Sequence, residues 1–150
     1  MVRNRVELAS MTFGVAGGVV GLVIARSLSF HANDFTSLSC NCEVLQTLQD
    51  ALLPAIFGSI LGLIGGLVSF ARSREGGIIL LLGSFTTAIG WLVALSRIIL
   101  AGSSMAIELA FGYILVDFLW WNLLIFGAGL IAFPTTRRIL KGLRTERWLP

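Results

Sequence analysis

Residues 54–74, PAIFGSILGLIGGLVSFARSR, form a long apolar run with Gly58, Gly62 and Gly66 at a regular four-residue spacing. That spacing places the three glycines along one side of an α-helix. In lipid, apolar side chains gain little by leaving the lipid for a neighbouring helix, so helices associate through close packing, which a strip of glycine permits. The stretch therefore predicts a membrane-spanning helix whose glycine strip, a glycine zipper, packs on another helix.

Basic residues gather in alternate flanks of the apolar runs: before the first, between the second and third, and after the fourth. Nine of the 11 lysines and arginines lie in three short flanks. The positive-inside rule places such flanks in the cytoplasm, which predicts an even number of spans, cytoplasmic termini and a location in the plasma membrane. Because a basic flank beside a span is more often in contact with anionic lipid headgroups, no nucleic-acid partner is expected. The nine residues are Arg3, Arg5, Arg72, Arg74, Arg137, Arg138, Lys141, Arg144 and Arg147.

The composition excludes an ordinary soluble domain. Of the 150 residues, 56% are hydrophobic and 13% charged, against about 45 to 50% and about 25% in soluble domains. Four runs are long enough to cross about 30 Å of hydrocarbon, which takes about 20 helical residues. They cover residues 8–30, 54–71, 77–100 and 109–133. We therefore expect one all-α domain, a four-helix transmembrane bundle with an outer loop at 31–53 and a basic cytoplasmic tail at 134–150.

The first run carries glycines at the same spacing as the second, Gly14 with Gly18 and Gly17 with Gly21. Small residues four apart let helix backbones approach closely, either within one chain or between two copies. We favour a close pair between the first and second runs over a homodimer face.

The outer loop contains a short segment, 43–53, that predicts an amphipathic helix. Its valine and leucine residues recur at helical spacing with polar residues opposite them, as in helices that lie at a membrane surface. Pro54 follows. Because proline lacks an amide donor, it either opens the second span at its first turn or kinks one continuous helix.

Asp117 lies inside the fourth apolar run, where an ionised carboxylate costs about 2.5 to 3.5 kcal/mol on insertion scales. Tyr113 and Trp121 lie one turn before and after it and share its face of the helix. Arg97 and Arg26, near the outer ends of the third and first runs, are candidate counter-charges. Two roles are open for Asp117. It is part of a relay for protons or ions, or it forms a structural ion pair. We favour the structural role, because a relay needs several titratable groups in series.

Three tryptophans, Trp91, Trp120 and Trp121, fall near the middle of their apolar runs, whereas tryptophans in membrane proteins usually lie at the two interfaces. They either fill the core of the bundle or contact something large and flat: a quinone, pigment, haem or lipid, or a neighbouring subunit. We favour core or subunit packing, because aromatic rings carry much contact area. Asn122 beside them needs a polar partner, which predicts an interior or subunit-facing position.

Cys40 and Cys42 lie in the outer loop, on the side of the membrane where thiols are commonly oxidised. A disulfide between two cysteines so close in sequence is strained, which favours disulfides to a partner chain. A local disulfide also stays open. A metal site with His31 is a third, weaker alternative, since the ligands are few and their spacing is not that of common zinc sites. The sequence contains no phosphate loop, catalytic triad or metalloprotease motif.

Three glycine-rich and basic segments, 58–66, 72–77 and 127–130, give the chain a resemblance to small four-span membrane proteins of bacteria and archaea. The paired outer cysteines are distantly similar to those of claudin-like tetraspans. The tryptophan and the wider cysteine spacing of the claudin first loop are missing. The resemblance implies a four-span architecture and assigns no functional residue.

These observations predict a non-catalytic subunit that packs into and stabilises a larger membrane protein complex. Its expected partners are other membrane protein subunits and membrane lipids, and we expect no cofactor of its own beyond bound lipid. The alternative is a small homo-oligomeric channel or transporter that uses Asp117. A weaker alternative is a redox or metal-binding protein that uses Cys40 and Cys42. We do not expect an enzyme.

Overall fold

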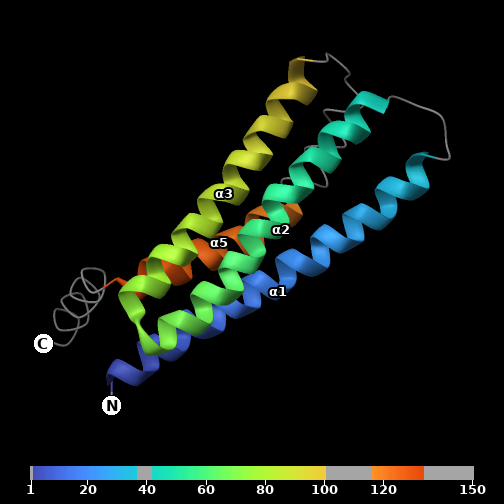
Figure 1. Ribbon diagram of the computed structural model, residues 1–150. Coiled ribbons are helices and arrows are strands. Elements are labelled where there is room, and N and C mark those ends of the chain that lie inside the picture. Colours follow the sequence, from blue (N-terminus) through green and yellow to red (C-terminus); the bar gives the residue numbers. More distant parts are fainter. Residues whose placement is uncertain (1, 37–41, 101–115, 134–150) are drawn as a thin grey trace, which may run out of the picture.

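The chain is described here by a computed structural model in which four helices account for nearly all placed residues. The structure describes residues 2–36, 42–100 and 116–133, with side chains at 5–27, 50, 52–97, 99–100 and 120–133. The helices are α1 (Val2–Thr36), α2 (Cys42–Ala71), α3 (Ser73–Leu100) and α5 (Val116–Ala132) (Figure 1). Within the described ranges only Arg72 and Phe133 are not helical, so the predicted all-α fold is confirmed for this part of the chain.

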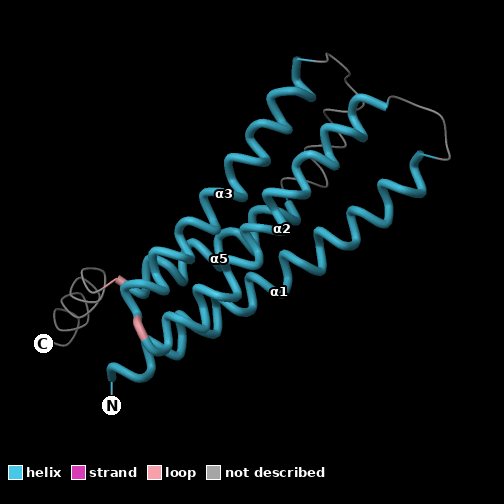
Figure 2. Tube along the Cα trace, viewed as in Figure 1, coloured by secondary structure: helices cyan, strands magenta, loops and turns pink. Residues whose placement is uncertain are grey.

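The helices run alternately in opposite directions and form a ring (Figure 2). Helix α1 packs on α2 and α5, and α3 packs on the same two helices from the other side. Helices α2 and α5 lie diagonally across the ring and touch less. This is the up-and-down order of helices found in antiparallel bundles.

One residue, Arg72, joins α2 to α3. Its amide donates to the carbonyl of Val68 at 2.7 Å, and its own carbonyl accepts from the amide of Gly76 at 2.9 Å. The chain therefore reverses within one turn and fixes the register of the two helices. We call this the Arg72 end of the bundle, and the opposite end of α2 and α3 the Arg97 end. The N-terminus lies at the Arg72 end (Figure 1).

Three helices are long and apolar enough to cross a membrane, judged by length and composition. The qualifying segments are Arg5–Ser27, Leu52–Ala71 and Ser73–Arg97. In α5 the apolar part is shorter, Trp120–Ala132. Part of the predicted fourth span, 109–133, lies outside the described residues.

The helices are longer at the Arg97 end than the sequence patterns indicate. Helix α1 continues through residues 31–36, and α2 begins at Cys42 and runs unbroken past Pro54. The predicted amphipathic segment and the second span are thus one helix. Gly90 of α3 makes room for the proline, since a methyl group on Gly90 would overlap the ring of Pro54.

Small residues are common inside the bundle, where they surround a few large buried ones, Leu80, Trp121 and Ile125. Many large apolar residues lie on its outside. On α2, Ser59 is fully buried and its hydroxyl donates to the carbonyl of Ala55 at 2.7 Å. On the opposite side of the same helix, Leu53, Phe57 and Leu67 are 60%, 61% and 62% exposed. Soluble monomers rarely expose an apolar surface of this extent. The distribution is typical of helices surrounded by lipid or by other apolar helices.

Glycines set the distance between α1 and α2. A methyl group placed on Gly14 would lie 2.9 Å from the Cα of Gly66, and one on Gly18 would lie 2.7 Å from the carbonyl oxygen of Ser59. Gly58 instead faces α3, where an added methyl would lie 2.6 Å from the carbonyl oxygen of Gly83. A four-residue step overshoots a full helical turn by about 40°. The glycine strip therefore winds around α2 from α3 toward α1.

Candidate functional site

Two of the three central tryptophans belong to the core. Trp121 of α5 is 1% exposed and Trp91 of α3 is 6% exposed. The indole of Trp121 packs on α1 at a glycine, because a methyl group on Gly21 would lie 2.7 Å from its Cε3 atom. Trp121 therefore occupies the space that Gly21 leaves between α1 and α5.

Trp120, the residue next to it, points out of the bundle and is 72% exposed. It shares its face of α5 with Leu123 and Leu130, which are 56% and 41% exposed. Gly127 lies on this face too, and no described atom outside its own helix backbone lies within 4 Å of a methyl group placed on it. We call these four residues the outer face of α5. It presents a protruding indole and, about 10 Å away along the helix, a notch.

Asn122 contributes an unsatisfied acceptor to the bundle. Its Oδ1 atom is buried and accepts no hydrogen bond from the described residues. Asn122 lies one turn before Phe126, whose ring packs edge-on against Phe85 of α3 with centroids 6.3 Å apart. Residues one turn apart share a face, so Asn122 lies on the α3 side of α5. A buried acceptor without a donor costs about 1 to 3 kcal/mol.

The counter-charge that the structure gives to Arg97 is Asp50. Nη1 of Arg97 donates to Oδ2 of Asp50 at 3.1 Å, and the two side chains are 57% and 59% exposed. Asp50 lies in the segment 43–53, for which only an amphipathic helix was predicted. The tight turn at Arg72 was the missed signal, because a one-residue turn brings together residues at similar distances on either side of it.

The other charged candidates are placed only in part. Arg26 is exposed on α1. Asp117 belongs to α5, but its side chain lies outside the described residues, as does all of Tyr113. The predicted pairing of Asp117 with an arginine therefore stays a prediction.

The predicted cysteine site lies outside the described side chains. Cys40 is not among the described residues, while His31 and Cys42 are placed only as backbone, in α1 and at the start of α2. Among the described residues, no group of three or more His, Cys, Asp or Glu side chains could hold a metal ion.

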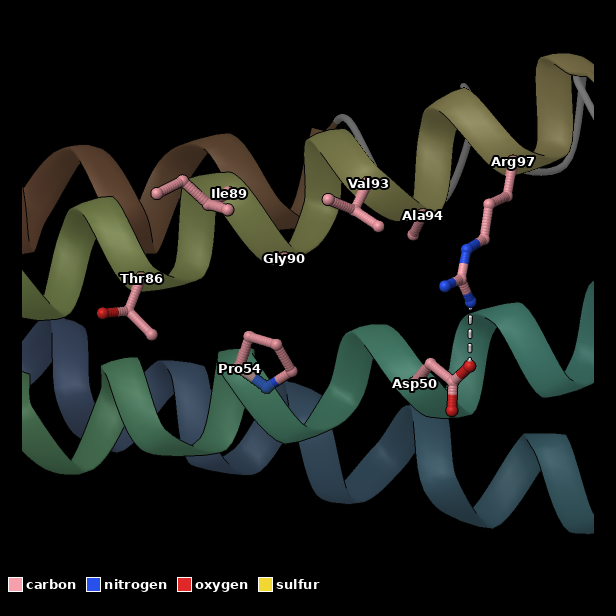
Figure 3. A pocket seen from close by; sticks show the side chains of 8 residues that line it. All are labelled: Asp50, Pro54, Thr86, Ile89, Gly90, Val93, Ala94 and Arg97. Atoms are coloured by element: carbon pink, nitrogen blue, oxygen red, sulfur yellow. Dashed lines mark hydrogen bonds and ion pairs between the residues drawn. The ribbon is translucent and has the colours of Figure 1, made fainter.

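A groove of about 470 Å³ runs along the α2–α3 seam at the Arg97 end (Figure 3). Pro54 and Gly90 are in close contact along it, because a methyl group on Gly90 would overlap the proline ring. The Asp50–Arg97 ion pair closes one end, and Thr86 lies at the other (Figure 3). The lining residues are Asp50, Pro54, Thr86, Ile89, Gly90, Val93, Ala94 and Arg97. The groove is thus apolar along its length and charged at one end.

No protein-family model, curated protein or solved structure matches the chain. The resemblance to small four-span membrane proteins therefore rests on the segments quoted in the sequence analysis.

Proposed function

We propose that this chain is a small, non-catalytic integral membrane subunit that crosses the membrane four times and packs through the outer face of α5 into a larger membrane protein complex. The observation that carries the proposal is Trp120, a tryptophan 72% exposed on the same face of α5 as the glycine notch at Gly127.

The positions of the charged residues support membrane insertion. Between the Arg72 turn and Arg97, helix α3 carries its charges only near its two ends. Arg72 and Arg97 are separated by 25 positions in the sequence, which corresponds to about 37 Å of helix, somewhat more than the roughly 30 Å hydrocarbon core. On α2, Asp50 lies at the same level as Arg97, because Oδ2 of Asp50 is 3.1 Å from Nη1 of Arg97. The apolar outer surface between the two ends then faces lipid or other helices.

The depth of Trp120 favours a protein partner over lipid. A methyl group on Gly17 would lie 3.0 Å from the carbonyl oxygen of Trp121, and Gly17 is near the middle of the apolar segment Arg5–Ser27. Trp120 is therefore close to mid-depth. An indole N–H prefers the polar interface of a membrane, so an outward tryptophan at this depth is better accommodated by a partner that supplies contact area and an acceptor.

The spacing of Trp120 and Gly127 favours a partner of a different sequence. Copies of one chain inserted in the same direction hold equivalent residues at equal depth, so a symmetric contact brings Trp120 toward its own equivalent. The notch at Gly127 lies about 10 Å away along the helix axis. A complementary partner helix has a small residue opposite Trp120, where the indole protrudes. It has a bulky residue opposite Gly127, where it fills the notch.

The experiment is purification of the full-length chain from its native membrane in a mild detergent, followed by mass analysis of the intact complex. We expect other membrane subunits in fixed stoichiometry. The variant Trp120→Ala releases them, and the matched control Phe57→Ala, an outward aromatic 61% exposed on α2, retains them.

Two outcomes contradict the proposal: a monomer, or a complex that contains only copies of this chain. A self-oligomer whose ion flux is abolished by Asp117→Asn supports the alternative of a homo-oligomeric channel or transporter. Loss of bound metal in the double variant Cys40→Ser, Cys42→Ser supports the redox or metal-binding alternative.

A further inference from the structure

The groove on the α2–α3 seam has the length of one membrane leaflet. Its lining on α3 extends from Thr86 to Arg97, a separation of 11 residues and about 16 Å of helix. Half of a roughly 30 Å hydrocarbon core is about 15 Å. With the ion pair at the membrane surface, the apolar part of the groove reaches the middle of the bilayer.

The volume of the groove fits a single hydrocarbon chain and is too small for a helix. A 16 Å length of α-helix about 10 Å across fills about 1,250 Å³, whereas the groove measures about 470 Å³. The side chains of Ile89 and Val93 border the groove (Figure 3). They are 60% and 47% exposed, so a ligand can reach the groove sideways from lipid.

The charged end of the groove offers donors and acceptors side by side. Arg97 uses Nη1 for its hydrogen bond to Oδ2 of Asp50, and a guanidinium has five N–H donors in all. Pro54 has no amide proton, so the carbonyl of Asp50, four residues earlier, lacks its usual helical donor. Both charged side chains are more than half exposed. The end of the groove thus combines one cation with a carboxylate and a free backbone acceptor.

We infer that this groove binds one acyl chain of a phosphatidylethanolamine molecule, a zwitterionic phospholipid with a primary ammonium group. The lipid phosphate accepts hydrogen bonds from Arg97. Its ammonium donates to the carboxylate and the backbone carbonyl of Asp50. The inference rests on the membrane insertion in the proposed function and not on the partner subunit.

The headgroup assignment follows from the charges at the mouth of the groove. Phosphatidylglycerol lacks a cation for Asp50, and the quaternary ammonium of phosphatidylcholine has no N–H to donate. Charge-assisted hydrogen bonds are about twice as strong as neutral ones, so losing one weakens binding clearly. We therefore expect about tenfold stronger retention of phosphatidylethanolamine than of the other two lipids with identical chains.

The test is native mass spectrometry of the full-length chain, purified and then exposed to mixed micelles that contain equal amounts of the three lipids with palmitoyl and oleoyl chains. The wild-type chain is expected to keep one phosphatidylethanolamine. Val93→Trp fills the groove, so retention of phosphatidylethanolamine should fall about tenfold. The matched control Leu92→Trp, at a neighbouring position 65% exposed but outside the groove, retains it.

A second pair of variants separates the headgroup from the chain and guards against misfolding of the tryptophan variants. Arg97→Gln leaves the apolar groove intact and lowers the preference for phosphatidylethanolamine about tenfold. Arg26→Gln removes an exposed arginine of α1 and keeps that preference.

Three results overturn the inference: equal retention of the three lipids by the wild-type chain, equal loss from the Val93 and Leu92 variants, or unchanged preference in Arg97→Gln. Resistance of the chain to alkaline extraction from membranes, measured in parallel, reports on insertion alone. Failure of lipid binding in an inserted chain therefore counts against the groove and not against the proposed function.

Discussion

Trp120 and Trp121 are consecutive residues of one helix, yet one is 72% exposed and the other 1%. Their side chains point about 100° apart around the helix axis. Trp121 packs against a glycine of α1 and completes the interior, whereas Trp120 shares the outer face of α5 with an open glycine, Gly127, two turns away. The same residue types, tryptophan and glycine, thus appear on both faces of α5, with partners inside the chain on one face only.

The difference shows how this chain divides its contacts between folding and association. Inside, each glycine is needed, because a methyl group on Gly18 or Gly66 would lie within 3 Å of backbone atoms. Outside, Gly127 has no such neighbour in the described residues. Glycine weakens a helix by about 1 kcal/mol relative to alanine, so an outward glycine that no neighbour within the chain requires supports a contact outside it.

The largest difference in the free energy of unfolding is expected between the variants that lack Trp121 and Trp120. Trp121→Ala empties a buried site and should lower the free energy of unfolding by about 3 to 5 kcal/mol. Trp120→Ala should lower it by less than about 1 kcal/mol in the isolated chain, as for most surface substitutions. Denaturation in detergent, followed by circular dichroism, measures both. Equal losses would mean that the two faces of α5 do not differ as described.

The next effect concerns the glycines of the two faces. Gly18→Ala forces α1 away from the carbonyl of Ser59, which lies 2.7 Å from the added methyl, and overpacking of this kind costs about 1 to 3 kcal/mol. Gly127→Ala meets open space and should raise helix stability by up to about 1 kcal/mol. The two variants should therefore shift the thermal midpoint in opposite directions. A shift of the same sign in both would contradict the division between the faces.

Much of the architecture follows from the sequence because it depends on apolar length and on turn chemistry. The all-α fold is predicted correctly for the described residues, and three of the four expected runs are helices long enough to cross a membrane. Which of Trp120 and Trp121 faces the interior cannot be predicted from the sequence. Helices apolar on every side carry no polar stripe to mark the inner face. Side-chain size is the better guide in such helices, because small residues line the contacts between them.

The Asp50–Arg97 ion pair could not be predicted from the sequence for a related reason. The predicted outer loop, 31–53, leaves Asp50 outside the second span, whereas α2 runs continuously from Cys42. From the sequence alone, Pro54 is compatible with the start of a helix and with a kink inside one. Only the space at Gly90, which lies on another helix, decides between them. The Asp50–Arg97 pair is therefore a consequence of tertiary packing.

A smaller effect is expected from the hydroxyl groups of the two faces of α1. Ser10 is fully buried and donates to the carbonyl of Ala128 in α5 at 2.9 Å. Thr12 is exposed and donates to Leu8 of its own helix at 2.8 Å. Ser10→Ala should cost about 0.6 to 1.7 kcal/mol, the range for hydrogen bonds between membrane helices. Thr12→Ala should change stability by less than about 0.5 kcal/mol, and a larger loss in Thr12→Ala than in Ser10→Ala would reverse the roles of the two faces.

The smallest effect on stability is expected at the Arg97 end, although we propose a ligand there. The Asp50–Arg97 pair is more than half exposed on both sides, and exposed ion pairs contribute about 0.2 to 1 kcal/mol at most. Arg97→Gln should therefore leave the unfolding midpoint almost unchanged in lipid-free detergent, as should Glu75→Gln, which breaks the exposed pair with Arg72 at the opposite end. Added phosphatidylethanolamine should raise the midpoint of the wild-type chain and of Glu75→Gln, because a ligand that binds only the folded state stabilises it. The same addition should not raise the midpoint of Arg97→Gln, and an equal rise in all three chains would mean that the lipid stabilises the bundle without using the mouth of the groove.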